Sequence, residues 1–115
     1  MNLSSDRVGG VAVVRLSESR LMYPLLSEFT QAVSALFAAG DRHVVIDLSA
    51  VSYVDSATIG CLMDLYRQAA SAGGALALSG VQKRVETMLT MTGAHNFLQL
   101  FGTEADAIRA MGGAA

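Results

Sequence analysis

Residues 43–60, HVVIDLSAVSYVDSATIG, join a nearly continuous apolar run to a cluster of small polar residues. The β-branched run at 44–48 is typical of a central strand that is covered on at least one face, and Asp47 is its polar exception. Further along the chain, apolar side chains recur at helical spacing. The stretch therefore predicts a buried strand, a loop that carries Asp55 and Ser56, and an amphipathic helix.

Outward from this stretch, strand and helix patterns alternate along the chain. Before it, glycines 9 and 10 separate two strand-like runs that can form a hairpin, and Pro24 suits the first turn of a helix that ends near Gly40. After it, a second helix is expected to follow Ser56. We expect the side of this helix that packs against the core to consist of Ile59, Leu62, Met63, Tyr66 and Ala70.

The complete order of elements predicts the fold class. The expected strands are residues 3–8, 11–16, 44–48, 75–78 and 97–101. A third helix should end at Gly93, and Thr103 with Asp106 has the form of a capping box for a final helix through Met111. The order β-β-α-β-α-β-α-β-α implies an α/β fold with right-handed helical crossovers. We predict one domain over residues 1–115, with a small mixed sheet, helices mainly on one face, and a frayed tail at 112–115.

The composition limits the classes of protein to which the chain can belong. Its 115 residues suffice for one core, and a formal net charge of −2 with scattered basic residues argues against a nucleic-acid surface. No charge-free apolar run reaches the roughly 20 residues that cross a bilayer, and the N-terminus lacks the segments of a leader, so we expect a cytoplasmic protein. The single cysteine, Cys61, cannot form an internal disulfide and is expected to be buried and inert.

Asp55 and Ser56 admit two interpretations. Either side chain can accept hydrogen bonds from the free N–H groups of the following helix, so helix capping is a sufficient explanation for one of them. Alternatively, Ser56 is a phosphoacceptor. A phosphate there would add about −1.5 to −2 charges beside Asp55 and at a helix N-terminus. Such a change can switch a protein interface without unfolding the domain.

Catalytic interpretations find little support in the residues. A nucleophilic serine needs a base, and His43 and His95 lie far from Ser56 in the sequence. The chain has neither a G-x-S-x-G elbow nor a Walker-type glycine-rich loop. We therefore expect no enzyme, no metal and no cofactor. A small catalytic or ligand-carrying domain is the alternative from another class, and it would need a convergent set of titratable groups.

Residues 43–101 resemble the STAS domain of bacterial anti-sigma factor antagonists. The resemblance rests on a strand of the form V-[IL]-x-D-L-S, a block V-x-[YF]-[MVI]-D-S-[ST]-G-L-G, and a later M-x-T-G that is represented here by Met91, Thr92 and Gly93. The order of elements agrees with that family over essentially the whole chain. The resemblance therefore implies the fold and suggests a function.

The function that the resemblance implies is a non-enzymatic binding switch that regulates transcription. In that family, the serine after the signature acid is phosphorylated by an anti-sigma factor that is also a serine kinase of the GHKL ATPase type. The unphosphorylated form binds this kinase and frees the sigma factor, and a serine phosphatase is a further expected partner. By this resemblance Ser56 matches the phosphoacceptor, Asp55 the signature acid, Asp47 the acid of the preceding strand and Gly60 the last glycine of the motif.

The chain departs from the family pattern at two places. Thr58 stands where the pattern has its first glycine, which stiffens the turn and offers a second hydroxyl as a candidate phosphoacceptor. The loop after the second strand lacks the G-x-L-D of the family, and with it an acid at the partner-facing surface.

The resemblance also defines a docking surface and a second functional hypothesis. We expect the loop around Asp55 and Ser56 and the first turns of the following helix to bind the partner. The expected partner-binding residues, of which Thr58, Asp64 and Arg67 should be exposed at the rim, are Asp55, Ser56, Thr58, Gly60, Asp64 and Arg67. The alternative is a STAS subunit that binds the ATPase or transporter of a membrane transport system.

Overall fold

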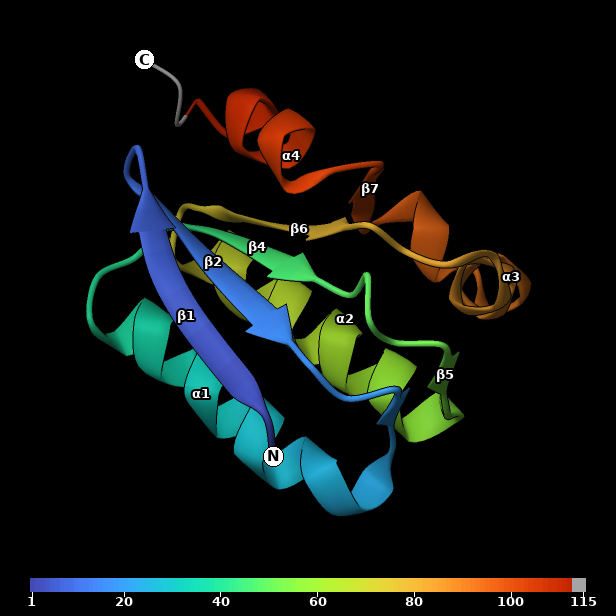
Figure 1. The fold of residues 1–115 in the computed structure, drawn as a ribbon. Coiled ribbons are helices and arrows are strands. Elements are labelled where there is room, and N and C mark those ends of the chain that lie inside the picture. Colours follow the sequence, from blue (N-terminus) through green and yellow to red (C-terminus); the bar gives the residue numbers. More distant parts are fainter. Residues whose placement is uncertain (113–115) are drawn as a thin grey trace.

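The computed structural model, which describes residues 1–112, is built on a five-stranded sheet with the spatial order β1-β2-β4-β6-β7 (Figure 1). Its strands are β1 (Leu3–Val8), β2 (Val11–Leu16), β4 (His43–Asp47), β6 (Ala75–Ser79) and β7 (Gln99–Phe101). The first pair is antiparallel and the other pairs are parallel, so the sheet is mixed as predicted. β4 lies at its centre, where Val44, Val45 and Ile46 are fully buried. Of the predicted tail, only Gly112 lies within the described residues.

The helices pack on the sheet in two layers. They are α1 (Leu26–Ala38), α2 (Ser56–Ser71), α3 (Lys83–Thr92) and α4 (Glu104–Ala110). α1 and α2 cover one face of the sheet, α3 lies beyond its end, and α4 covers the opposite face (Figure 1). The main core cluster takes buried side chains from α1, α2 and α3, whereas α4 supplies Ala107 to a small second cluster with Val11, Val13 and Val45. Helices mainly on one face were predicted, and the structure confirms this.

Glycines set the turns where the sequence predicted them. Gly9 and Gly10 have φ values of 56° and 83°, and this left-handed backbone forms the tight connection in which Val8 pairs with Val11. Gly93 ends α3 with a φ of 79°. Thr103 caps α4 by accepting a hydrogen bond from the backbone N–H of Asp106 at 3.1 Å. The predicted hairpin and both helix ends are therefore confirmed.

A two-stranded sheet that the sequence did not predict joins two loops. It pairs β3 (Arg20–Leu21) in parallel with β5 (Tyr53–Val54), and the backbone N–H groups of Ser52 and Tyr53 donate to the carbonyl of Ser19. Strands of two residues show no alternation that a sequence pattern could reveal. This pairing brings the loop after β2 next to the segment that leads into α2.

Two predictions about burial were wrong in part. The inward face of α2 consists of Thr58, Ile59, Leu62, Leu65 and Ala69, because side chains three and four positions apart share one side of the helix. Ala70 points outward, and Met63 and Tyr66 only flank the core. Cys61 is half-buried, not buried as expected, because it lies at the border of this face.

Two segments next to helix ends differ from the prediction, one after α3 and one before α1. The last strand is shorter than predicted, because Ala94–Asn96 form a 3-10 turn and Phe97 lies 54% exposed before β7 begins. Pro24 lies in a 3-10 turn, Tyr23–Leu25, that leads directly into α1.

In residues 1–112, none of the helices combines the length and apolarity that crossing a membrane would require.

Candidate functional site

Asp55 is the residue at which α2 is capped. Its backbone is extended, and its Oδ1 accepts a hydrogen bond from the backbone N–H of Thr58 at 2.9 Å. An acidic cap satisfies one of the free N–H groups of the first turn and also interacts favourably with the helix dipole. The capping interpretation therefore holds for Asp55, and Ser56 becomes the first residue of the helix.

The carboxylate of Asp55 is also bonded to the loop after β2. Its Oδ2 accepts a hydrogen bond from the backbone N–H of Tyr23 at 3.0 Å, and its Oδ1 lies 2.6 Å from the hydroxyl of Thr58. Burial acts to raise the pKa of Asp55, but the hydrogen bonds from Thr58 and Tyr23 outweigh it and leave the pKa below its ordinary value. Asp55 is thus an ionised acceptor whose two oxygens are engaged within the domain.

Ser56 is exposed at the first position of α2. The expectation that it lies accessible at the first turn is confirmed. Because Asp55 supplies the cap, the side chain of Ser56 is not needed for that purpose. The free N–H groups at a helix N-terminus attract anions, so a phosphate on Ser56 would lie in a favourable field, next in sequence to the carboxylate of Asp55.

Thr58 is not exposed, and this expectation was wrong. It is fully buried, and its Oγ1 donates a hydrogen bond to the carbonyl of Leu21 at 2.7 Å. The pairing of β3 with β5 covers this side of the first turn, which a single sequence pattern could not reveal. A hydroxyl without accessible surface cannot reach a kinase active site in this conformation, so Thr58 is a poor second phosphoacceptor.

Four of the candidate residues form one exposed stripe along α2. Ser56, Gly60, Asp64 and Arg67 follow each other at spacings of three or four residues and are all exposed, as expected for one side of a helix. Arg67 donates to Asp64 at 2.7 Å in a surface ion pair. An added Cβ at Gly60 would meet no atom within 4 Å. The stripe is therefore a smooth, solvated helix surface that begins at Ser56.

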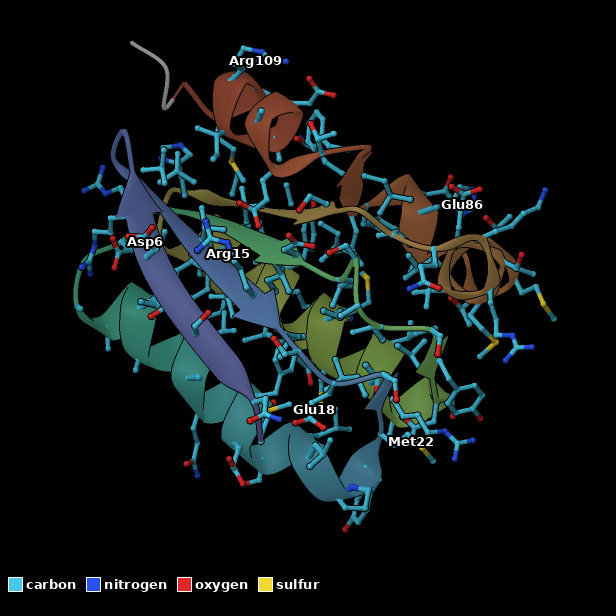
Figure 2. All side chains as sticks on the ribbon, viewed as in Figure 1. Asp6, Arg15, Glu18, Met22, Glu86 and Arg109 are labelled. Carbon is cyan, nitrogen blue, oxygen red and sulfur yellow. The ribbon has the colours of Figure 1, made fainter. Side chains whose placement is uncertain are left out.

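Tyr23 adjoins the start of α2, a proximity that sequence reasoning missed. Its side chain is 75% exposed and its backbone N–H bonds to Asp55. Nearby, the guanidinium of Arg20 lies 5.3 Å from the centre of the Tyr53 ring. Figure 2 shows Met22, the neighbour of Tyr23, at the end of the molecule where α2 begins. No local pattern could signal this proximity, because it depends on the pairing of two-residue strands.

Asp47 lies apart from this surface, on the side of the sheet that α4 covers. Its Oδ1 accepts the backbone N–H of Ser49 at 2.8 Å, and it pairs in register with Arg15. Arg15 donates to both oxygens of Glu104 at 2.9 and 3.0 Å, and Figure 2 shows it on this same side of β2. Burial acts to raise the pKa of Asp47, but the hydrogen bond from Ser49 and the positive charge of Arg15 act to lower it. Asp47 thus lies beside the Arg15–Glu104 pair, which connects β2 to α4.

The described part of the chain offers no geometry for metal binding. Within residues 1–112, no three His, Cys, Asp or Glu side chains are grouped so that they could hold a metal ion. His95 points its Nδ1 toward the carbonyl of Leu89 at 3.4 Å, away from Ser56 in the sequence and in its contacts. The candidate site is therefore an exposed surface with one free hydroxyl, not a pocket with converging titratable groups.

Comparison with known proteins identifies the family. The model of the STAS domain matches residues 2–107, which is most of the chain. The chain therefore belongs to the STAS domain family. An anti-sigma F factor antagonist of Paenibacillus polymyxa is 25% identical over 108 residues, which cover 94% of this chain and 92% of that protein.

Solved structures share the fold at lower identity. An anti-sigma factor antagonist domain protein of Planctomyces limnophilus superimposes with a TM-score of 0.87 at 20% identity and covers 96% of this chain and 97% of that one. The phosphorylated form of the Bacillus cell fate determinant SpoIIAA gives 0.73 at 17% identity, with 95% and 98% covered. A murine anion transporter, Slc26a9, gives 0.79 at 20% identity, with 93% of this chain but 18% of the transporter covered. These structures support the fold class.

Proposed function

We propose that this protein is an anti-sigma factor antagonist whose binding surface is switched by phosphorylation of Ser56. The single observation that carries the proposal is the exposure of Ser56 at the first position of α2, with the cap supplied by its neighbour Asp55. The hydroxyl is therefore both accessible and free of a structural task. The name of the relative from Paenibacillus polymyxa and the solved phosphorylated form of SpoIIAA support the same function.

The proposed partner is an anti-sigma factor that is also a serine kinase of the GHKL type. It would bind the unphosphorylated protein through the exposed stripe on α2, which begins at Ser56 and continues through Gly60, Asp64 and Arg67. In the modification step, the Ser56 oxygen takes the γ-phosphoryl group of ATP, ADP leaves, and the hydroxyl proton passes to a base of the kinase. A serine phosphatase would reverse the step by hydrolysis.

The effect of the phosphate follows from its charge. It adds about −1.5 to −2 charges to a surface where Asp55 is already ionised, because the hydrogen bonds to Asp55 keep its pKa low. The helix N-terminus offsets part of this repulsion within the domain. A partner surface that fits the neutral hydroxyl would instead meet a dianion, so the complex would dissociate while the domain stays folded. The protein itself performs no catalysis in this scheme and works in the cytoplasm.

A second candidate function is a STAS module that binds a component of a membrane transport system. The observation in its favour is the likeness to the part of the murine anion transporter Slc26a9 that this chain matches. It would use a similar surface with a different partner. Phosphorylation of Ser56 is not required for that function, so the two proposals differ in a measurable property.

The test is to incubate the purified protein with ATP and candidate GHKL-type serine kinases and to locate phosphate by mass spectrometry. We expect phosphate on Ser56 in the wild-type protein and none on Ser56→Ala. The unmodified protein and Ser56→Ala should bind the kinase, whereas Ser56→Asp should bind more weakly, although aspartate carries one charge and phosphate nearly two. Unmodified protein together with unchanged binding of Ser56→Asp would contradict the switch and favour a constitutive adaptor.

A further inference from the structure

The side chain of Thr58 links two segments that lie far apart in the sequence. It is fully buried, and its Oγ1 lies 2.7 Å from the carbonyl oxygen of Leu21 and 2.6 Å from Oδ1 of Asp55. The single hydroxyl proton of Thr58 lies between these two acceptor oxygens, which share it in a three-centre hydrogen bond. Leu21 precedes Thr58 by 37 residues. The hydroxyl therefore fixes the β3 segment against the first turn of α2.

A second bond closes the link on its other side. The Oδ2 atom of Asp55 accepts the backbone N–H of Tyr23 at 3.0 Å, two residues beyond Leu21. Thr58 and Asp55 are themselves joined by the bond from the Thr58 backbone N–H at 2.9 Å. The turn that carries Tyr23 is thus held at two points by the two residues that flank Ser56 and Ala57.

The position of Tyr23 gives this link a consequence for binding. Its side chain is 75% exposed, which is more than any other large hydrophobic side chain among residues 1–112 except Met91. Exposed tyrosines beside a functional surface are frequent anchors of protein interfaces. Its backbone N–H bonds to Asp55, the residue before Ser56, so the Tyr23 turn adjoins the start of α2 where Ser56 lies.

A glycine at position 58 would not form this link. The motif that this chain resembles has glycine there, and glycine has no side chain to reach Leu21 or to shield Asp55. The threonine also restricts the backbone of the first turn through its branched Cβ. Thr58 therefore makes a connection that a glycine at this position could not make.

We propose that Thr58 is a positioning residue that holds the Tyr23 turn against the start of α2, so that the Tyr23 ring and the Ser56 hydroxyl form one preformed docking surface for the serine kinase. This inference rests on the proposed function, because it assigns Thr58 a role in kinase binding at the same surface that begins at Ser56. Preformed surfaces bind more tightly because less ordering is required on association.

The link itself can be measured on the unmodified protein by NMR. Thr58→Val keeps the shape and removes the hydroxyl, Thr58→Ser keeps the hydroxyl, and Ile59→Val removes one buried methylene from the same turn as a control. In Thr58→Val we expect the amide of Tyr23 to exchange about tenfold faster, in line with the loss of one hydrogen bond, and the pKa of Asp55 to rise. Thr58→Ser and Ile59→Val should behave like the wild type. Unchanged exchange and pKa in Thr58→Val would overturn the inference.

The role in binding requires a double-mutant cycle with the kinase found to modify Ser56. We expect Tyr23→Ala and Thr58→Val each to weaken kinase binding by about tenfold, the scale of one anchor contact, and Thr58→Val to add less than about twofold in the Tyr23→Ala background. Independent, additive effects would overturn the positioning role. Failure of every kinase to modify the wild-type protein would overturn the proposed function and this role together, whereas unchanged NMR readouts with normal phosphorylation would overturn this inference alone.

Discussion

Asp55 illustrates how a single carboxylate organises a surface from within the domain. Its oxygens accept hydrogen bonds from the backbone of Thr58 and Tyr23 and contact the Thr58 hydroxyl. Because these acceptors are occupied, the direct contribution of Asp55 to a partner contact is limited. Its main effect is to place Ser56 at the start of α2 and to hold the turn at Tyr23 beside it.

The lowered pKa of Asp55 predicts how stability depends on pH. Its contribution is fully present above the unfolded-state pKa of about 3.9 and is lost as the pH falls through the lower folded-state value. Asp55→Asn keeps a capping group but loses the charge, so it should lower the free energy of unfolding by about 0.3–1 kcal/mol at pH 7. Urea unfolding at pH 7, 5 and 3 checks this.

The difference between Asp55→Asn and the wild type should shrink in the most acidic sample, because pH 3 lies below the unfolded-state pKa of about 3.9 and the contribution of the charge is being lost there. Asp64→Asn, on the exposed side of α2, serves as the matched control and should change little at any pH. A difference that persists undiminished at the lowest pH would show that the charge of Asp55 is not its cause.

At the scale of elements, α2 combines a core face with the proposed binding stripe. Leu62 and Leu65 are almost fully buried, whereas Ser56, Gly60 and Asp64 lie on the exposed side. The two faces can therefore be changed separately. Substitutions on the first should act on stability and those on the second on binding.

The buried face of α2 yields a prediction for core packing. Leu65→Ala should lower the free energy of unfolding by about 2–5 kcal/mol, because it leaves a cavity between α2 and the sheet. Met91→Ala is the control, since Met91 on α3 is 77% exposed and its truncation should stay within about 0.5 kcal/mol. Chemical unfolding monitored by circular dichroism measures both. Equal effects of the two truncations would contradict the assignment of Leu65 to the core.

Two glycines near α2 should respond to alanine in opposite directions. At Gly60, a Cβ meets nothing within 4 Å, so Gly60→Ala should stabilise the exposed helix by about 0.5–1 kcal/mol. At Gly74, a Cβ would lie 1.7 Å from the backbone oxygen of Arg42, so Gly74→Ala must displace the chain and destabilise it. Thermal melts of both variants provide the measurement. A destabilising Gly60→Ala would show that the backbone there needs glycine.

The elements differ in how well the sequence predicts them, and the reason is physical. β4 and the helices carry side-chain periodicities that report burial locally, so their positions are predictable. The β3–β5 pair has two residues per strand and no period, and it decides that Thr58 is buried and that Tyr23 adjoins Asp55. For this reason the exposure of Ser56 was predictable, whereas the environment of Thr58 required the three-dimensional arrangement.

At the scale of the whole molecule, the main core cluster and the small cluster beneath α4 must unfold together if residues 1–115 form a single domain. The described chain has a radius of gyration of 12.7 Å, close to the roughly 13 Å of a compact domain of this length. α4 is connected to the sheet by the Arg15–Glu104 bond and by Ala107 in the second cluster. These contacts tie the outer layer to strands β2 and β4 that also form the main core.

A single domain predicts one cooperative unfolding transition. The amide resonances of Leu62 in α2 and Ala107 in α4 should lose intensity at the same urea concentration, because unfolding of either layer exposes a face of the same central strands. Glu104→Gln weakens the ion pair with Arg15 while keeping a hydrogen-bonding group, so it tests whether α4 separates first. Coincident midpoints in the wild type and in this variant are the expected outcome. A lower midpoint for Ala107 than for Leu62 in the wild type would mean that α4 unfolds independently, and the remaining sheet would then expose Val13 and Val45 to solvent before the main core opens.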